Sequence, residues 1–284
     1  MKKKSLISIL VFLILCLCGC TNPGPSSTFE IRFIDVGQGD SALVECDGHY
    51  MLIDGGSSSA GDKVYDVLVE KGIQKLDILA ISHMHEDHIG GLYKALTFAS
   101  PKRTISNSTY SDTEAFRKLE RQLISNGAKI TIPRIGEKFG LGSAKVEVVD
   151  VTADDPNDSL VLLVTYGKTR FLFTGDIEYD GQKRLVDKYA NGGDTVFKVD
   201  VIKIPHHGSW GPGLFNNNND LNMLMRTFKP DYAIISAGKD NIYGHPHSET
   251  LELLEQADVT VYRTDLNGDI IVKSNGNKVT VEPK

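Results

Sequence analysis

The chain has 284 residues, of which 40% are hydrophobic and 24% charged, and this suits one large α/β domain with a substantial core. Its formal net charge is −6, and loss of an N-terminal leader containing three lysines would make it −9. The electric field of such a negative net charge repels nucleic acid and anionic lipid, and this weighs against a purely nucleic-acid-binding role. A polyanionic substrate would therefore have to be captured by metal ions and local basic residues.

The N-terminus has the features of an export signal followed by a tether. A basic segment precedes an apolar stretch over residues 6–17, which is too short to span a bilayer comfortably. The stretch ends in Leu17-Cys18-Gly19-Cys20, which resembles a bacterial lipoprotein cleavage box with Cys20 as the lipidated residue. We therefore expect a signal peptide over 1–19, a flexible tether over 20–28 and an extracytoplasmic, lipid-anchored domain over 29–284. The alternative, an uncleaved anchor, places the domain on the same side of the membrane.

The rest of the chain alternates strand-like and helix-like segments. An Asp-Gly pair at 47–48 between two apolar runs predicts a β-hairpin, and Gly72 ends a segment with apolar residues at helical spacing. Helices are expected over residues 62–71, 91–98, 113–126, 182–189 and 248–256. Strands are expected over residues 29–36, 41–46, 50–53, 76–81, 129–132, 144–149, 159–166, 169–174, 199–204, 231–236, 259–263 and 269–273.

Strand-rich stretches thus occur in both halves of the chain, with helices between them. Strands in both halves end in polar residues of the types that bind metals. This pattern predicts an α/β fold in which two sheets pack face to face with helices outside. No domain boundary is visible after the tether.

The stretch Ser82 to Gly91 carries the strongest chemical signal. It follows a buried strand and contains His83, His85, Asp87 and His88. A surface loop that happens to be rich in histidine is the alternative, but three imidazoles and a carboxylate so close together are typical of a metal site. Further candidate ligands follow other strands: Asp54, Asp176 and the pair His206-His207.

These motifs together resemble the metallo-β-lactamase superfamily, whose fold is a four-layer αβ/βα sandwich. Segments 33–41, 54–56, 205–209 and 241–246 resemble its ComEC-type branch, in which this domain is attached to the DNA-uptake channel of competent bacteria and is thought to degrade the non-transported strand. The membrane spans of that channel are missing here, so we expect a free-standing, lipid-anchored relative and carry over no transport function.

The resemblance implies two divalent metal ions, Zn²⁺ or Mn²⁺. His83 and His85 would hold one ion, Asp87 and His88 the other, Asp176 would bridge them, and His206 or His207 would complete the second site. Two bridged ions can activate a water and clamp a phosphoryl oxygen, and we expect Asp87 to take part in catalysis. Asp54, together with Asp35, is expected to orient a ligand histidine, although Asp54 reads equally well as a turn residue.

One position departs from the family pattern. Many members supply a third histidine to the first site from the segment before the Gly175-Asp176 pair, and this chain has none there. Asp158 or Asn157 is expected to substitute, or the site relies on water, and either arrangement favours a harder metal such as manganese.

Other side chains are expected to contact the substrate. His245, in the motif Tyr-Gly-His-Pro, is predicted to donate to a phosphate or protonate a leaving group, with a loop-stabilising role as the alternative. Ser209, Asn241 and Tyr243 are expected to bind substrate, and Lys203 to contact phosphate.

Three functions remain open on the sequence alone. The first is a phosphodiesterase or nuclease acting on DNA. The second keeps the metal site but acts on a cell-wall phosphodiester such as the phosphorylcholine groups of teichoic acid, or on another substrate of the fold. The third is a non-catalytic, lipid-anchored binding component that associates with competence or envelope proteins.

Overall fold

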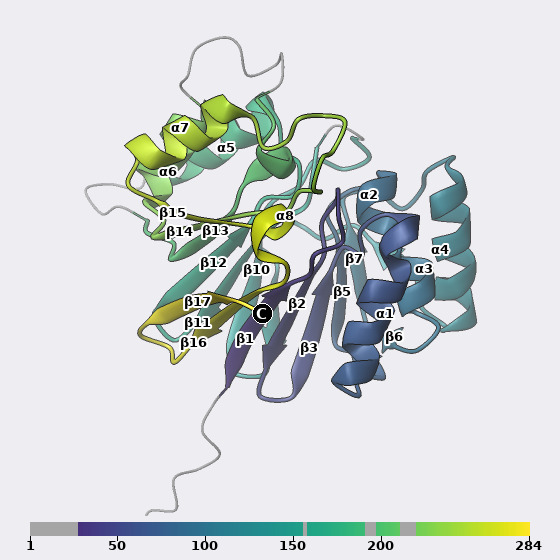
Figure 1. Cartoon of the computed structure of the whole chain (residues 1–284). Coiled ribbons are helices and arrows are strands. Elements are labelled where there is room, and N and C mark those ends of the chain that lie inside the picture. The colour runs from purple at the N-terminus through teal and green to yellow at the C-terminus, as the bar shows by residue number, and fades with distance from the viewer. Residues whose placement is uncertain (1–27, 156–157, 191–196, 211–219) are drawn as a thin grey trace, which may run out of the picture.

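A computed structural model describes residues 28–155, 158–190, 197–210 and 220–284. Their β-strands form two large mixed sheets and a two-stranded ribbon of β4 (Lys75–Leu76) and β6 (Ser100–Pro101). The first sheet has the order β17-β16-β1-β2-β3-β5-β7-β8, so that strands from both ends of the described chain lie in one sheet (Figure 1). Its strands are β17 (Val279–Pro283), β16 (Ile270–Ser274), β1 (Phe29–Phe33), β2 (Ala42–Cys46), β3 (His49–Ile53), β5 (Ile78–Ile81), β7 (Thr104–Ser106) and β8 (Ile130–Thr131).

The second sheet has the order β15-β14-β13-β12-β11-β10-β9. Strands β12 to β15 run parallel to one another, and the remaining pairs are antiparallel. Its strands are β15 (Thr260–Arg263), β14 (Tyr232–Ile235), β13 (Val201–Lys203), β12 (Thr169–Phe173), β11 (Val161–Tyr166), β10 (Ala144–Asp150) and β9 (Lys138–Leu141).

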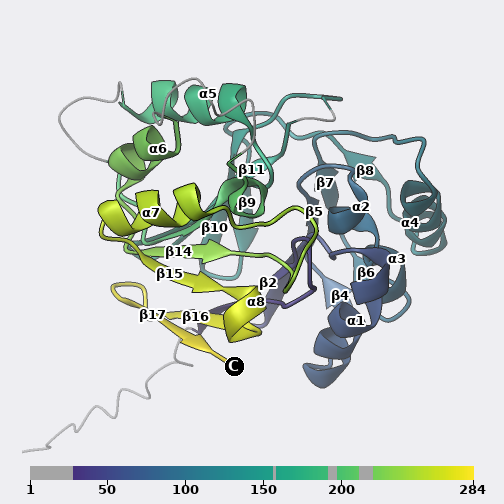
Figure 2. The same cartoon turned by 45° about the horizontal axis from the view of Figure 1, so that its top comes forward.

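Helices cover the outer face of each sheet (Figures 1 and 2). The first sheet carries α1 (Gly61–Glu70), α2 (Glu86–Ile89), α3 (Leu92–Ala95) and α4 (Glu114–Ser125). The second carries α5 (Tyr179–Ala190), α6 (Asp220–Phe228) and α7 (Ser248–Gln256). Shorter elements are η1 (Ser58–Ala60), η2 (Pro205–Gly208) and α8 (Thr264–Asn267). The structure confirms the expected four-layer αβ/βα arrangement.

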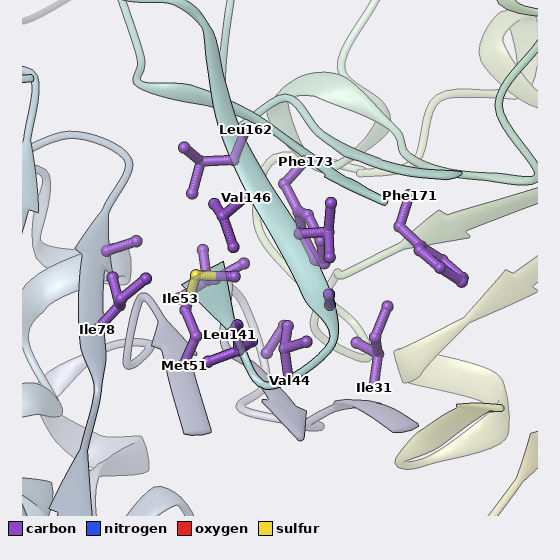
Figure 3. Close-up of a cluster of buried hydrophobic side chains, with 14 of the residues drawn as sticks. Ile31, Val44, Met51, Ile53, Ile78, Leu141, Val146, Leu162, Phe171 and Phe173 are labelled. Carbon is purple, nitrogen blue, oxygen red and sulfur yellow. The ribbon is translucent and has the colours of Figure 1, made fainter. Parts of the chain in front are cut away.

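The core between the sheets is built from alternate side chains of their facing strands. Figure 3 shows Ile31, Val44 and Met51 of the first sheet pointing toward Val146 and Phe173 of the second. Successive residues of a strand point to opposite faces, so the intervening side chains pack against the outer helices. Each strand therefore contributes side chains both to the core between the sheets and to the layer under the outer helices. The polar residues that follow the strands lie at the ends of the sheets.

Several local predictions are confirmed with shifted boundaries. Asp47 and Gly48 have φ values of 53° and 78° in the turn between β2 and β3, as a two-residue hairpin of this type requires. Thr113 caps α4 by accepting the backbone N–H of Phe116. The helix expected over 91–98 is present but shorter, as α3, and the sequence did not predict α2, which precedes it and contains Asp87 and His88.

Candidate metal centre

The centre lies where strands of both sheets end. Strand β5 is fully buried between β3 and β7, and the chain leaves it through Ser82 and His83 into α2. Asp54 follows β3 next to it and accepts the Ser82 N–H at 2.8 Å. The segment after β3 braces this loop, because Gly55 N–H donates to the His88 carbonyl at 2.7 Å.

His88 connects the two sheets. Its ring is completely buried, with Nδ1 3.0 Å from Asp54 Oδ2 and Nε2 3.1 Å from Asp176 Oδ2. Asp176 comes directly after Gly175, which follows β12 of the second sheet. A carboxylate on one ring nitrogen fixes the orientation of an imidazole while the other nitrogen faces the site, an arrangement typical of metal-binding histidines.

His207 approaches from η2 on the other side of Asp176. Its Nδ1 lies 2.9 Å from the Ser236 carbonyl, which can only accept, so Nδ1 carries a proton and Nε2 faces the site. That Nε2 lies 3.2 Å from Oδ2 of Asp87 and 3.2 Å from Oδ2 of Asp176. It is buried and makes no aligned hydrogen bond to either carboxylate.

Four of the predicted ligands therefore converge. One potential ligand atom from each of Asp87, His88, Asp176 and His207 lies within 4.8 Å of the others. Two imidazole nitrogens and two carboxylates that face a common region are the donor set that a divalent cation satisfies once the rings are neutral. The residues present thus fit the metal that the sequence predicted, and the histidine and carboxylate ligands suit Zn²⁺ or Mn²⁺.

His83 and His85 lie beside this group. His83 is buried with its ring centroid 4.1 Å from that of His88, and its Nε2 lies 2.9 Å from Nδ1 of the exposed His85. The Ser82 hydroxyl is 3.1 Å and the Ser159 hydroxyl 3.4 Å from His83 Nδ1. The two histidines expected to hold the first ion are thus adjacent to each other and to the four-ligand group.

Asp158 is placed away from these rings. Its carboxylate accepts from Arg184, from the Thr152 hydroxyl and from the Ser159 backbone N–H. The neighbouring Ser159 hydroxyl contacts both His83 and the Asp176 N–H, and sequence reasoning did not single it out. A ligand role for Asp158 stays a prediction, and Asn157 lies outside the described residues.

Sequence reasoning also missed Asp40 and the full role of Lys203. Asp40 Oδ1 lies 3.3 Å from His207 Nδ1, and Asp40 forms a second potential ligand group with Asp54 and His88. Lys203 is buried with its ammonium against Asp40 and Asp176, so it faces these carboxylates instead of solvent, where a substrate phosphate would approach. The motif Gly37-Gln38-Gly39-Asp40 was visible in the sequence as part of the family resemblance over 33–41, but Asp40 was given no role.

The electrostatics of the centre favour added cations. Burial opposes the charge on His88, but Asp176 and Asp54 outweigh it and hold the pKa of His88 well above its usual value. Burial likewise opposes ionisation of Asp176, yet His207 and His88 hold the pKa of Asp176 well below its usual value. Without metal, protons on the two rings therefore compensate the carboxylates. Two divalent cations would supply that compensation when the rings are neutral.

The other predicted residues lie around the rim or behind it. His206 is outside the four-ligand group, with Nδ1 3.8 Å from Glu178 Oε1. The His245 ring stacks between His207 and the exposed Tyr243, and burial together with the charges of His207 and His206 lowers the pKa of His245 to about 4. Asn241 and Ser209 make the backbone contacts of this rim: Asn241 accepts the N–H of His245, and Ser209 N–H donates to the His206 carbonyl.

Asp35 does not reach the centre. Its carboxylate accepts the Gly37 N–H at 3.1 Å and lies 3.6 Å from the Lys63 ammonium. These contacts shape the loop that carries Asp40.

The fold and this site define a metallo-hydrolase architecture, and the family model described as "Metallo-beta-lactamase superfamily" matches residues 34–239. The chain belongs to the metallo-beta-lactamase superfamily. It is 31% identical to ComE operon protein 3 of Bacillus subtilis over 93% of this chain and 34% of that protein. It is 28% identical to competence protein ComA of Neisseria gonorrhoeae over 86% and 32% of the two chains.

The chain is also 26% identical to recombination protein 2 of Haemophilus influenzae over 97% of this chain and 32% of that protein. It thus spans about a third of the length of the curated relatives it matches. Among solved structures, the metallo-beta-lactamase fold protein YhfI of Bacillus subtilis matches with a TM-score of 0.57 at 14% identity, over 87% of this chain and all of that one. No helix in the described part of the chain has the length and apolar character needed to cross a membrane.

Proposed function

We propose that this chain is an exported hydrolase that uses two divalent metal ions to cleave phosphodiester bonds, with DNA as its substrate. The observation that carries the proposal is the position of His207 Nε2, which lies 3.2 Å from one oxygen of Asp87 and 3.2 Å from one oxygen of Asp176 without an aligned hydrogen bond. Bound ions at such a site would polarise a phosphoryl oxygen and lower the pKa of a water.

The chain's own residues prepare the site for this chemistry. Asp54 fixes the His88 ring, and the Ser236 carbonyl fixes the His207 ring, so that each presents Nε2 to the centre. The half-buried His245 is neutral at pH 7 and lies at the rim, where its ring N–H can donate a hydrogen bond to a phosphate oxygen.

We propose DNA as the substrate because of the chain's sequence similarity to its relatives, and not from the geometry of the site alone. Two of the relatives are named competence protein and recombination protein, and both names support nucleic acid as the substrate class. Export rests on the cleavage motif at Cys20, which lies outside the described residues.

The test compares substrates and variants of the full-length chain in detergent. The protein is stripped with EDTA, reloaded with Mn²⁺ or Zn²⁺, and assayed on single-stranded DNA, bis-p-nitrophenyl phosphate and p-nitrophenyl phosphorylcholine, with bound metal measured in parallel. Asp176→Ala should lose bound metal and fall below roughly one hundredth of wild-type activity, because loss of even an outer partner typically costs 10–100-fold. Asp180→Ala removes an exposed carboxylate four residues further on and should change neither quantity.

Other outcomes would redirect the proposal. Preference for the phosphorylcholine ester would favour the cell-wall function. A metal-free, hydrolytically silent chain that still captures an envelope protein would favour the binding function. Activity that survives Asp176→Ala would contradict the mechanism.

A further inference from the structure

A cavity opens beside the candidate metal centre. Its volume is about 570 Å³, within the range of small-molecule binding sites. Met84 and His85 of the metal loop form one wall, and the segment between β7 and α4 forms another together with Asp154. A group bound here would therefore lie next to anything held at the metal centre.

The lining of this cavity is unsuited to phosphate. Among the described residues that form it there is no lysine or arginine, whereas Asp112 and Asp154 contribute carboxylates. The remaining polar groups are neutral amide and hydroxyl side chains: Asn107, Ser108, Ser111 and Thr113. A phosphate would meet two carboxylates and no lysine or arginine side chain, so the cavity fits an uncharged part of a substrate that carries N–H donors.

Tyr110 supplies an aromatic surface in this wall. Its side chain is 69% exposed, and its ring meets the buried Phe116 at 71° with the centroids 5.7 Å apart. Contact with Phe116 supports one part of the ring and leaves the rest open. Aromatic side chains presented in this way serve as stacking platforms for bases in proteins that bind single strands.

The wall is held in place before any ligand arrives. The Ser108 hydroxyl donates to Asp154 Oδ1 at 2.9 Å and accepts the Tyr110 N–H at 3.3 Å. Asn107 Nδ2 donates to the backbone carbonyls of Asp155 and Asp158 at 2.8 and 2.7 Å. Little ordering of this segment is therefore required on binding, and this favours affinity.

We propose that this cavity is a nucleobase subsite, in which one base beside the scissile phosphate stacks on Tyr110. The inference rests on the proposed nuclease function and assigns to this cavity the part of the substrate that it takes. An exocyclic amino group of the base donates to the carboxylate of Asp112 or Asp154, because carboxylates accept from such groups. Bases with an exocyclic amino group are preferred over thymine, which has none.

A cationic headgroup such as choline is the competing occupant. Recognition of a quaternary ammonium relies on a cage of Trp, Tyr or Phe rings, whereas the described lining of this cavity contains one such ring, Tyr110. A single ring with hydrogen-bond acceptors beside it matches a planar base better.

The test changes the enzyme and the substrate separately and together, as in a double-mutant cycle, and uses the full-length, metal-loaded chain. Cleavage of a single-stranded oligonucleotide is compared with cleavage of the same oligonucleotide carrying an abasic site next to the cleaved bond. Tyr110→Ala should lower kcat/KM on the intact strand roughly 5- to 150-fold, the measured range for one stacked base. On the abasic strand the same change should have no effect, because the stacking partner is already missing. Wild type should also cleave oligo-dC faster than oligo-dT.

Two variants control for folding. Tyr110→Phe keeps the ring and should retain wild-type kcat/KM. Tyr65→Ala removes a tyrosine in α1 that meets Phe98 at 67° with centroids 5.8 Å apart, away from the cavity, and should leave the ratio of intact to abasic cleavage unchanged. Equal losses on intact and abasic strands, or a loss confined to p-nitrophenyl phosphorylcholine, would overturn the base subsite while leaving the hydrolase intact. Absence of DNA cleavage by wild type would overturn the proposed function and the subsite together.

Discussion

Lys203 and Asp40 form an ion pair beneath the metal centre, with Lys203 Nζ 2.5 Å from Asp40 Oδ2. Both side chains are buried, and the ammonium also lies 3.3 Å from Asp176 Oδ1. Lys203 comes from β13 of the second sheet, and Asp40 from the loop after β1 of the first. Burial works against the charge on Lys203, but Asp40 and Asp176 outweigh it and raise its pKa. The pair therefore joins the two sheets and partly neutralises the carboxylates before metal binds.

Replacing Lys203 by methionine should destabilise the metal-free chain by about 3–5 kcal/mol, because it leaves buried carboxylates without their cation. Urea unfolding in EDTA measures the change. Lys198→Met is the matched control: it breaks an ion pair to Asp231 of 2.8 Å in which both side chains are half exposed, so its cost should stay below about 1 kcal/mol. Equal losses in the two variants would show that Lys203 does not carry this compensation.

Gly39 provides a second prediction, because it touches the metal loop directly. A Cβ at this position would lie 2.2 Å from the Asp87 carbonyl oxygen, and the residue has a φ of 132°. Gly39→Ala should therefore displace Asp87 and reduce both stability and bound metal. Gly37→Ala also places a side chain at positive φ but meets nothing within 4 Å, so it should cost only about 1–2 kcal/mol and keep the metal. Metal content after gel filtration separates the two effects, and full retention of metal by Gly39→Ala would contradict the contact.

Asp54 tests how strongly ring orientation controls metal binding. Its carboxylate accepts the Ser82 N–H and bonds to His88 Nδ1, without being one of the four converging ligands. Asp54→Ala should weaken metal binding 10- to 100-fold, as is typical when such an orienting carboxylate is lost. Competition with a fluorescent chelator measures the affinity.

The chain offers a close control for this variant. Asp77 also accepts a backbone N–H, from Tyr50 at 3.0 Å, and its carboxylate lies 3.2 Å from Nδ1 of His49. Neither of these partners belongs to the metal centre. Asp77→Ala should leave metal affinity unchanged. A similar weakening in both variants would indicate a general loss of stability and not a specific effect on His88.

Local signals account for the parts of the molecule that the sequence predicts well. Each of these signals lies within a few neighbouring residues: the Asp47-Gly48 turn, the apolar spacing of Val64, Val67 and Leu68 in α1, and the histidine-rich cluster after β5. Short strands without such signals were missed: β7 and β9 have four residues or fewer, and each is defined by its neighbours in the sheet. Strand β17 likewise forms an edge that only its pairing with β16 establishes.

The site divides along the same line. His83, His85, Asp87 and His88 could be named because they adjoin in sequence, and Asp176 because it follows a strand. Asp40 could not, since its partners His207 and Lys203 come from the opposite sheet. The distinction between His206 and His207 depends on backbone angles: both have φ near 50°, and this turn sends only His207 toward Asp176. Residue type alone carries no such directional information.

Proton binding at the centre leads to the last prediction, an inverted pH dependence with and without metal. Burial opposes protonation of His88 and His207, but their carboxylate partners, Asp176 first, raise both pKa values well above the usual 6.5. A histidine whose pKa is higher in the folded than in the unfolded chain adds its full stabilisation at pH values below the unfolded-state pKa. That stabilisation is lost as the pH rises through the folded-state pKa. The depressed pKa of Asp176 contributes above about pH 4 and is lost only at strongly acid pH.

In the metal-free chain this cluster should therefore add most to the free energy of unfolding between about pH 4 and 6.5. At higher pH the free energy of unfolding should fall by up to about 1.4 kcal/mol per pH unit for each ring as the histidines deprotonate. With Zn²⁺ the trend should reverse, because the ligands must lose their protons to bind metal. Urea midpoints at pH 5.5, 7.0 and 8.5, in EDTA and in Zn²⁺, measure both slopes. His88→Gln should flatten the metal-free slope, whereas His49→Gln, on an exposed ring, should not. A metal-free midpoint that rises steadily from pH 5.5 to 8.5 would mean that the rings are neutral in the folded chain, and the carboxylates would then need another source of positive charge.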